Sequence, residues 1–392
     1  MQIKVSKDIL IDWVALTSEI SVREPGTASH EIKFMADGDV IYVASTNAIR
    51  SQYITGKMEG DGVEVVEAGA ICIPGKPLKE ALALLKGDAF TLISDGSSTQ
   101  VSGGGGEELV LCGMDPSTWA VMPKMSGKAA CFDIPVSVFR EIRSLMGFGC
   151  SKDQTRAPMT SMFIEVMPDG TVHCTSTDQQ RVSFYTAPAG TATSIEMGRF
   201  DGVIKIAMPV DAAVCASNRV LSHIDGLVGI SVDASKVMMS TPAVRFFCSQ
   251  EAGSENYPRM RDLLRDKARF SLLASRAELT RVSKLIHVVA SKSVCRLDFD
   301  PAGSVLLSGK GKVNKSNRSK QSIALTDLEG DMFPKNEIVV SSEDLNEAIS
   351  ALSADDVRIG LTITNNDTLG PILTIRQGEC WRHLIFQARE VD

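Results

Sequence analysis

The sequence predicts an α+β protein made of three tandem copies of one domain, and a repeated pattern of elements carries that prediction. A short apolar strand ends at Pro74, at Pro209 and at Ser341, and each time a helix and two further strands follow. The three junctions lie roughly 130 residues apart, and self-similarity at a fixed period indicates repeated domains.

A second set of strand-to-helix junctions, at Ser6, Pro135 and Ser275, supports the same division. Each begins another strand-helix-strand-strand unit, so each domain contains two such units and the chain contains six helices. A serine accepts a hydrogen bond from a free N–H at a helix start, and a proline suits a first turn that has no donor to lose. The domain boundaries predicted from these units are residues 1–124, 125–265 and 266–392.

The individual elements follow from hydrophobic periodicity. Apolar residues spaced three and four apart predict helices near Lys7–Glu19, Pro77–Lys86, Val136–Phe148, Val210–His223, Arg276–Val289 and Glu343–Leu352. Apolar runs bounded by turn residues predict strands at Ile3–Val5, Glu31–Met35, Val40–Ser45, Ile71–Ile73, Leu109–Leu111, Phe132–Ile134, Ile204–Met208, Val228–Val232, Val237–Ser240, Phe270–Leu273, Ile338–Val340, Val357–Thr362 and Ile372–Ile375. The Asp37-Gly38 pair between two of these strands is a two-residue hairpin signal.

Composition indicates an ordinary soluble protein with 392 residues, 44% of them hydrophobic and 23% charged. No stretch approaches the roughly 18 uninterrupted apolar residues of a membrane helix, and Met1 is followed by no secretory segment, so we expect a cytoplasmic protein with no membrane partner. Nine cysteines without a C-x-x-C pair favour reduced thiols over a disulfide framework or a zinc site. We expect no metal and no cofactor.

No motif in the sequence calls for catalysis. The five histidines are scattered, with no nucleophile or carboxylate at motif spacing. The run Gly103–Gly106 lacks the Gly-Lys-Ser/Thr and the helix of a phosphate loop, so it reads as a hairpin tip. An Asp178–Arg181 pair at a strand end is more often structural than an acid–base pair. We therefore expect a protein that is not an enzyme, although a hydrolase or transferase with a convergent polar pocket remains the alternative.

Basic residues recur at helical spacing in all three predicted domains. The helix near Pro77–Lys86 carries Lys79 on the side opposite its leucines, and the later helices carry Arg140 with Arg143 and Arg281 with Lys284. A stripe of this kind is either a contact surface for an anion or only a solvated face.

The chain resembles the bacterial DNA polymerase sliding clamp family, the beta-subunit processivity factors. The resemblance rests on Ile3–Glu19, on Arg156–Met162 followed by Thr177–Val182, and on Asn256–Arg261, in this order inside the threefold repeat. It implies a head-to-tail homodimer that closes into a ring, each chain supplying half, with helices lining the hole. Such a ring encircles double-stranded DNA without sequence preference and tethers the polymerase for processive synthesis.

The resemblance also explains how a chain of net charge −7 can work on DNA, since a closed ring retains DNA by topology and needs only weak phosphate contacts. The candidate DNA-binding residues are Arg23, Lys79, Arg140, Arg143, Lys152, Gln154, Arg156, Arg219, Arg281 and Lys284. Several of them alternatively serve only solubility. The basic run Lys310–Lys320 is not expected from the family, and it is a candidate contact for DNA or a partner.

The family docks short linear peptides of the DNA polymerase, the clamp loader and repair proteins in an apolar pocket. Carried over to this chain, the pocket residues are Met159, Thr177, Gln180, Arg181, Val182, Pro258, Leu263, Leu384, Ile385 and Phe386. Two features depart from the family pattern. Gln180 stands where a histidine is common, and the ending Ile385–Asp392 is longer and more acidic than the usual tail. The alternative is therefore a non-catalytic clamp-like scaffold of a phage or mobile replicon with altered partners.

For ring closure we expect the region of Leu109 and Leu111 in one chain to meet the region of Ile286 and His287 in a second chain through edge-strand pairing. A histidine in that contact would weaken it when protonated, so the dimer is expected to loosen below roughly pH 6. A monomeric scaffold with the same fold is the alternative.

Overall fold

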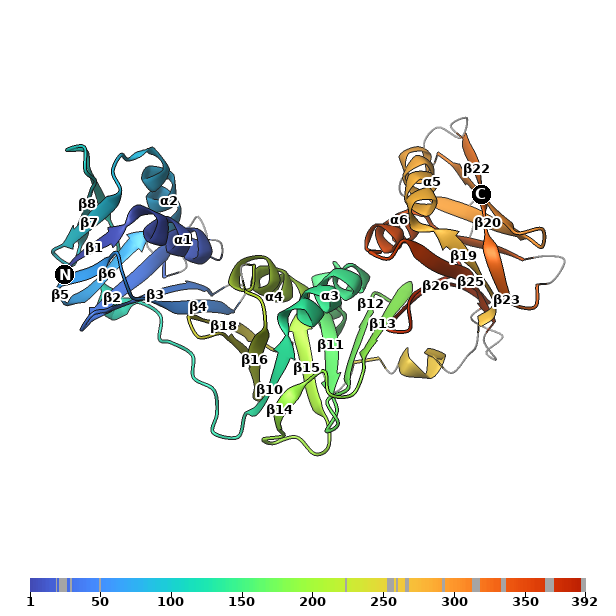
Figure 1. Ribbon diagram of the computed structural model, residues 1–392, viewed down its shortest axis with the longest axis horizontal. Helices are drawn as coiled ribbons and strands as arrows, with labels where there is room; N and C mark the ends of the chain where they lie inside the picture. Colours follow the sequence, from blue (N-terminus) through green and yellow to red (C-terminus); the bar gives the residue numbers. More distant parts are fainter. Residues whose placement is uncertain are drawn as a thin grey trace. The chain divides into compact units, whose positions relative to one another are not determined.

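The computed structural model describes residues 1–18, 20, 27–28, 30–48, 51–222, 224–251, 257–258, 260–264, 268–290, 293–311, 318–332, 336–363 and 370–388. It divides into two compact units. Figure 1 labels helices and strands of both units. Unit 1 consists of Met1–Ser137, Thr193–Gly202 and Asp211–Gln250, and unit 2 consists of Val138–Ala192, Val203–Val210 and Glu251–Asp392. Helices packed on antiparallel sheets make the architecture α+β, as the sequence predicts.

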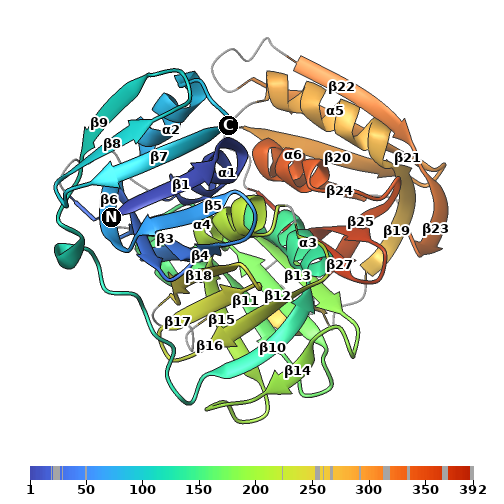
Figure 2. The same ribbon diagram turned by 60° about the vertical axis from the view of Figure 1, so that its left-hand side comes forward.

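Unit 1 contains a five-stranded sheet in the order β5-β1-β7-β8-β9. Its strands are β1 (Gln2–Ser6), β5 (Val63–Glu67), β7 (Ala89–Ser94), β8 (Ser98–Ser102) and β9 (Glu108–Cys112). The helices α1 (Lys7–Ser18) and α2 (Gly75–Leu84) pack against each other beside this sheet (Figure 2). Leu10, Val14, Leu78 and Leu82, spaced as the helical pattern predicts, enter the core with Phe90 of the sheet.

Unit 1 also contains a nine-stranded sheet in the order β14-β10-β16-β17-β18-β4-β3-β2-β6. The strands are β2 (Glu31–Asp37), β3 (Val40–Asn47), β4 (Gln52–Met58), β6 (Gly69–Pro74), β10 (Ala130–Pro135), β14 (Thr193–Glu196), β16 (Leu227–Val232), β17 (Lys236–Ser240) and β18 (Val244–Ser249). Gly56 in β4 lets Trp13 of α1 pack on the strand, because an added Cβ would lie 2.1 Å from the indole Cη2. The short helix α4 (Val210–Cys215) continues as a π-helical turn, Ala216–Val220.

Unit 2 contains a nine-stranded sheet in the order β15-β11-β12-β13-β27-β26-β25-β19-β23 and a four-stranded sheet in the order β22-β21-β20-β24. The strands of the larger sheet are β11 (Ser161–Val166), β12 (Val172–Thr177), β13 (Arg181–Ala187), β15 (Ile204–Pro209), β19 (Ala268–Ser275), β23 (Thr326–Gly330), β25 (Asp356–Ile363), β26 (Pro371–Gln377) and β27 (Trp381–Phe386). Those of the smaller sheet are β20 (Val294–Asp300), β21 (Ser304–Lys310), β22 (Arg318–Ala324) and β24 (Glu337–Ser341).

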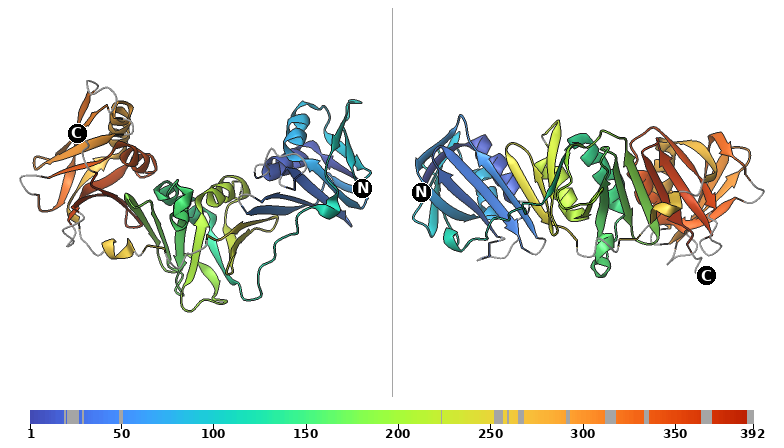
Figure 3. Two further views of the ribbon diagram at one scale, coloured as in Figure 1. Left: turned by 180° about the vertical axis from the view of Figure 1, so that it is seen from behind. Right: turned by 90° about the horizontal axis from the view of Figure 1, so that it is seen from below.

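The helices of this part of the chain are α3 (Val136–Met146), which begins at the boundary between the units, α5 (Arg276–Val289) and α6 (Ser342–Ser350). The last two pack against each other, orange and red in the left view of Figure 3. Ser341 caps α6 by accepting a hydrogen bond from the Asp344 N–H at 3.2 Å, as predicted, whereas the Ser275 side chain makes no such bond at the start of α5.

The two nine-stranded sheets correspond strand for strand. When one order is reversed, β14, β10, β16, β17 and β18 match β23, β19, β25, β26 and β27, and β4, β3, β2 and β6 match β13, β12, β11 and β15. Each sheet therefore has a joint at the same place, where β18 pairs with β4 in unit 1 and β27 pairs with β13 in unit 2. This correspondence confirms the repeat of elements in the sequence, while the three domain boundaries stay a prediction.

Most expected elements occur close to their predicted bounds. The helix α5 has the predicted bounds, α2 begins two residues earlier than expected at Gly75, and Gly103–Gly106 lies in the turn between β8 and β9. The predicted helix Val210–His223 is wrong in length, because the α-helix ends at Cys215 and a π-turn follows. Glu19 and His223 lie outside the described residues.

All nine cysteines are free thiols. Within the described ranges, no three His, Cys, Asp or Glu side chains form a group that could hold a metal ion. No helix in the described part of the chain is long and apolar enough to cross a membrane.

Candidate partner-binding site

The turn between β12 and β13 is held by its own side chains. The Asp178 carboxylate accepts hydrogen bonds from the N–H groups of Gln180 and Arg181 at 2.9 and 3.0 Å. The Thr177 hydroxyl donates to the Arg181 carbonyl at 2.8 Å and accepts from the Gln179 N–H at 3.1 Å. Gln179 has a φ of +77°, so this network stabilises a backbone conformation that is rare for a side chain other than glycine. The turn is therefore a rigid support for the strand that follows.

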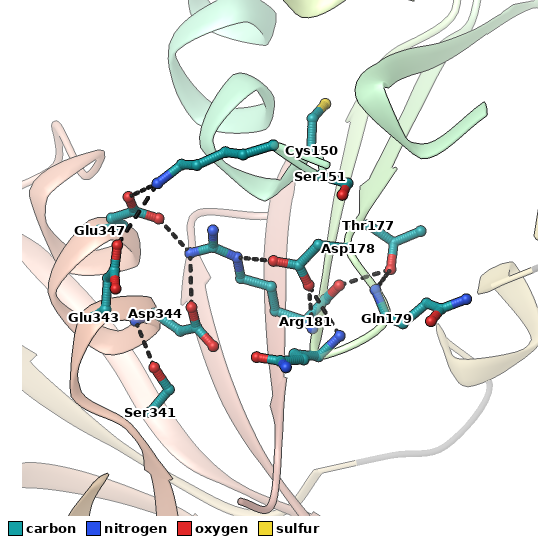
Figure 4. Close-up of polar contacts among 12 residues, drawn as sticks. Cys150, Ser151, Thr177, Asp178, Gln179, Arg181, Ser341, Glu343, Asp344 and Glu347 are labelled. Atoms are coloured by element: carbon teal, nitrogen blue, oxygen red, sulfur yellow. Dashed lines mark hydrogen bonds and ion pairs between the residues drawn. The ribbon is translucent and has the colours of Figure 1, made fainter. Parts of the chain in front are cut away.

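The Arg181 side chain joins this turn to helix α6 (Figure 4). It is only 3% exposed. Its Nε lies 2.9 Å from Asp178 Oδ2, and its Nη1 lies 2.7 Å from Glu347 Oε2 and 3.4 Å from Asp344 Oδ1. Its guanidinium also lies over the Phe148 ring at 5.5 Å. Arg181 is thus the centre of an ion-pair cluster. The sequence analysis predicted this arginine as a residue of the peptide pocket.

The carboxylates around Arg181 respond to it differently. Burial raises the pKa of Asp344 above its ordinary value in spite of the nearby guanidinium. Burial also acts to raise the pKa of Glu347, but the hydrogen bond from Lys152 and the charge of Arg181 outweigh it and hold that pKa below its ordinary value. The Lys152 Nζ lies 2.8 Å from Glu347 Oε1. Two cations therefore face a cluster of acids from α6 and the turn.

An apolar cluster occupies the other face of the same joint. Val182, Phe184, Ile372 and Leu384 form its buried floor, and Met260, Leu263 and Phe386 pack against it while only partly buried. Val182 and Leu384 are direct partners in the β13–β27 ladder, and the Phe386 N–H donates to the Gln180 carbonyl at 3.0 Å. The structure therefore brings together Val182, Leu263, Leu384 and Phe386 of the predicted pocket.

Strand alternation separates two predicted pocket residues from this cluster. Successive side chains of a strand point to opposite faces, so Arg181 and Ile385 lie on the face opposite Val182 and Leu384. Both are buried, at 3% and 1% exposed. Arg181 is held in the ion-pair cluster and Ile385 is buried on the same face, so their place in the peptide pocket stays a prediction.

The remaining predicted pocket residues flank the cluster. Thr177 is buried in the turn and Gln180 is exposed at its tip. Met159 is half-buried at the end of a 3₁₀ segment, Gln154–Thr160, and is not a member of the cluster formed by the described residues. Pro258 is half-buried, and its carbonyl accepts from the Met260 N–H at 2.9 Å.

The predicted DNA-binding residues have the following positions. Lys79 of α2 is exposed, and Arg140 and Arg143 of α3 are half-buried. Arg281 and Lys284 are exposed on α5, where Arg281 pairs with Glu278 at 2.8 Å. Ile142, Leu145 and Met146 of α3 are buried, which confirms the predicted apolar side of that helix.

The loop candidates contact other parts of the protein. Lys152 is exposed but pairs with α6, and Arg156 is exposed and donates to Gln179 Oε1 at 3.2 Å. Gln154 is exposed. Lys310, Arg318 and Lys320 are exposed at one end of the β21–β22 hairpin.

Several predicted residues cannot be placed. Arg23, Lys312, Lys315 and the tail beyond Ala388 lie outside the described residues, as does the side chain of Arg219.

The predicted contact between chains stays a prediction, and the structure shows where its residues lie. Ile286 is 1% exposed and packs against β21, where an added Cβ on Gly309 would lie 3.0 Å from it, so its side chain is not at a surface. His287 is half-buried in the same helix. A helix also cannot supply strand pairing. Two of the edge strands of the described sheets lie near these regions: β9, which carries Leu109 and Leu111, and β22, on which α5 packs.

Sequence reasoning missed some members of the cluster and of the ion-pair group. Phe184 was detectable, since it follows Val182 at the two-residue period of a strand. Ile372 is far from Val182 in the chain, and so are Asp344 and Glu347 from Arg181. No local pattern connects these residues, because only the pairing of β13 with β27 and the packing of α6 bring them together.

Comparisons with known proteins agree with this architecture. No family model matches the chain. It is 20% identical over 363 residues to the beta sliding clamp of Staphylococcus epidermidis, covering 92% of both chains. Its fold matches the DNA polymerase sliding clamp of Bacillus subtilis at a TM-score of 0.85, with 20% identity and complete coverage of both chains. It matches the DNA polymerase III subunit beta of Pseudomonas aeruginosa bound to griselimycin at a TM-score of 0.85, with 15% identity and complete coverage of both.

Proposed function

Because the chain is a divergent member of the beta sliding clamp family, we propose that it is a DNA sliding clamp, a ring-shaped homodimer that encircles double-stranded DNA. In this role it performs no catalysis. It holds a replicative polymerase on DNA and docks short peptides of the polymerase, the clamp loader and repair proteins. The division into three domains at residues 1–124, 125–265 and 266–392 is part of the proposal.

One observation supports the ring most strongly: each unit contains a small open sheet. Among the described residues its edge strands are β5 and β9 in unit 1 and β22 and β24 in unit 2, and β9 and β22 are the edges that we propose to pair. Such edges are open to pairing with another chain, and a head-to-tail contact that closes makes a ring. The charges of the two edges are complementary, since Glu108 is exposed on β9 and Arg318 and Lys320 are exposed on β22.

Exposed basic residues on the helices support the DNA contact. Lys79, Arg281 and Lys284 project from helices whose other sides are buried. Cations of this kind attract phosphates without reading bases, and the overall charge of −7 keeps the attraction weak enough for movement along DNA.

The apolar cluster around Val182 supports peptide docking. Its partly buried rim, formed by Met260, Leu263 and Phe386, offers apolar side chains beside the rigid turn of Gln180. Short peptides concentrate their binding energy in a few large anchors, so we expect micromolar dissociation constants, about 8 kcal/mol.

The second candidate is a clamp-like scaffold of a phage or mobile replicon with altered partners. Gln180 at the exposed tip of the turn and Phe386 at the rim favour it, since both depart from the family pattern at the docking surface. Such a scaffold would differ from a replicative clamp in one measurable way: it would form the dimer but would not bind a polymerase-derived clamp-binding peptide.

Light scattering on the native protein at micromolar concentration tests the ring directly. We expect a particle of twice the 42.1 kDa chain mass. A particle of a single chain mass at that concentration would rule out the homodimeric ring.

A further inference from the structure

A cavity of about 640 Å³ lies within unit 1, at the joint between β4 and β18. Its volume is within the roughly 300–1,000 Å³ of small-ligand and peptide-anchor pockets. One wall is the segment from Pro116 to Met122, and the opposite walls come from the strands and from the turn before β18. All its lining residues belong to unit 1.

The wall segment is anchored by Lys33 and Trp119. The Lys33 Nζ donates to the Pro116 carbonyl at 2.9 Å and lies 5.6 Å from the centre of the Trp119 ring. Trp119 in turn meets the Tyr53 ring edge-on at 5.5 Å. Contacts with Lys33 and Tyr53 thus hold Trp119 in the wall of the cavity.

Several large apolar side chains that line the cavity are exposed to solvent. Val121 is 90% exposed, Met35 is 42% exposed and Met122 is 38% exposed, and all three line the cavity. Burying such groups against a partner is favourable because it removes apolar surface from water.

The charged residues that line the cavity are all basic. Lys33, Lys57 and Arg245 line it, and no aspartate or glutamate does, although the chain has 48 acidic and 41 basic residues. Lys57 and Arg245 are exposed, and neither pairs with a carboxylate among the described residues. The Lys57 Nζ instead lies 5.8 Å from the centre of the Tyr42 ring. An occupant is therefore expected to carry negative charge beside its apolar groups.

The cavity occupies the place in its sheet that the apolar cluster of Val182 occupies in the other. The β4–β18 joint corresponds to the β13–β27 joint in strand order, and each has a segment alongside it that leads into the next strand, β10 or β19. The two joints are therefore equivalent positions in the two sheets, and the cavity has a basic lining.

We propose that this cavity is a second docking site, for a short acidic peptide of a partner protein that inserts one or two large apolar anchors between Trp119 and β4. The basic lining is expected to select acidic partners for this site. The inference depends on unit 1 alone and does not require the ring.

Fluorescence anisotropy tests the proposal with a labelled peptide that carries a leucine–phenylalanine pair between two pairs of aspartates. The test variant combines Lys57→Glu with Arg245→Glu. A control of equal charge combines Lys4→Glu with Lys128→Glu, which are exposed in unit 1 and do not line the cavity. A second control combines Leu263→Ala with Phe386→Ala in the cluster of unit 2.

The native protein should bind the probe, and the cavity variant should bind it about tenfold more weakly or worse, because two attractions become repulsions. The Lys4 and Lys128 control should change the affinity less than about twofold, and a probe with asparagines in place of the aspartates should bind more weakly to the native protein. Equal binding by the cavity variant, or an equal loss in the Lys4 and Lys128 control, would overturn the proposal. The proposal would also be overturned if the native protein did not bind the probe, which is the result expected if a second copy or a segment of the same chain fills the cavity.

A loss of affinity only in the Leu263 and Phe386 variant would show that the probe binds at the cluster around Val182. That result would refute the second site and leave the proposed clamp function standing.

Discussion

The buried Arg181 of β13 forms an ion pair with the half-buried Glu347 of α6, with 2.7 Å between Nη1 and Oε2. The pair links a strand that ends in a tight turn to a helix far along the chain. Asp178 and Asp344 complete the surroundings of the guanidinium, so its single charge balances more than one acid. The cluster fixes the turn that supports the proposed docking surface.

Replacing Arg181 by alanine should strongly destabilise unit 2. Removal of Arg181 leaves the buried Asp344 without its cation, and breaking a buried pair typically costs about 3–5 kcal/mol. Urea unfolding measures the loss. Arg281→Ala removes an arginine from an exposed pair with Glu278 and should leave the urea midpoint unchanged. Equal midpoints for native protein and Arg181→Ala would show that the cluster does not stabilise the fold.

Glu31 should make the stability of unit 1 depend on pH. The side chain is 2% exposed, and burial raises its pKa from 4.5 to about 7. Because the folded state holds this proton more tightly than the unfolded state, the stabilisation is complete below pH 4.5 and is lost as the pH rises through 7. The loss amounts to roughly 3 kcal/mol by pH 8.

Glu31→Gln keeps the shape of the side chain and removes its charge. The variant should therefore be more stable than the native protein at pH 8 and should show a flatter profile between pH 5 and pH 8 in unfolding experiments. A parallel profile for both proteins would show that Glu31 is not the titrating group.

Alanine at both Leu263 and Phe386 should weaken docking at the cluster around Val182. Both side chains pack on the cluster while only partly buried, so they can be shortened without opening the core. Calorimetry with a polymerase-derived clamp-binding peptide should show a loss of about tenfold or more. Leu84→Ala, at an 82% exposed position of α2, is the matched control and should bind as the native protein does. Unchanged affinity in the double variant would place the peptide elsewhere.

Alanine at both Arg140 and Arg143 should reduce DNA affinity about equally for unrelated sequences. Contacts with phosphates carry no sequence information, and each one lost should lower the salt slope by about 1. Titrations of labelled duplexes at several salt concentrations give both quantities, with Lys4→Ala on β1 as the control. An unaltered slope would remove these arginines from the DNA contact.

Reversing the charges of Arg318 and Lys320 to glutamate should weaken the dimer. If β22 pairs with β9 of a second chain, the new glutamates face Glu108, and the added Glu108→Lys substitution should restore part of the affinity. Sedimentation at several protein concentrations measures both effects. If the charge reversal of Arg318 and Lys320 left the dimer affinity unchanged, pairing at this edge would be contradicted.

The sequence was sufficient for much of the fold because periodicity is a local signal. The apolar spacing of Leu279, Val282 and Ile286 predicted α5 at its observed bounds, and Ser341 marked the start of α6. The same spacing could not show that Ile286 packs on its own sheet and not on a second chain. An apolar helix side has the same sequence pattern in both cases.

Side-chain faces and distant partners were harder to predict. Alternation along β27 would have separated Ile385 from Leu384, but only once the bounds of the strand were known. The acids around Arg181 and the cavity of Trp119 depend on segments that meet through the sheet joints. Lys57 and Arg245 carry no motif, so nothing local marked them as neighbours.

Retention on circular DNA tests the clamp proposal most directly. The protein is incubated with a circular plasmid under conditions in which its subunits exchange, and is then washed at high salt, which removes phosphate-bound protein. A closed ring should stay on the circular plasmid and leave when one cut makes the DNA linear, because only its topology holds it. Equal loss from circular and linear DNA, or equal retention on both, would contradict a sliding clamp.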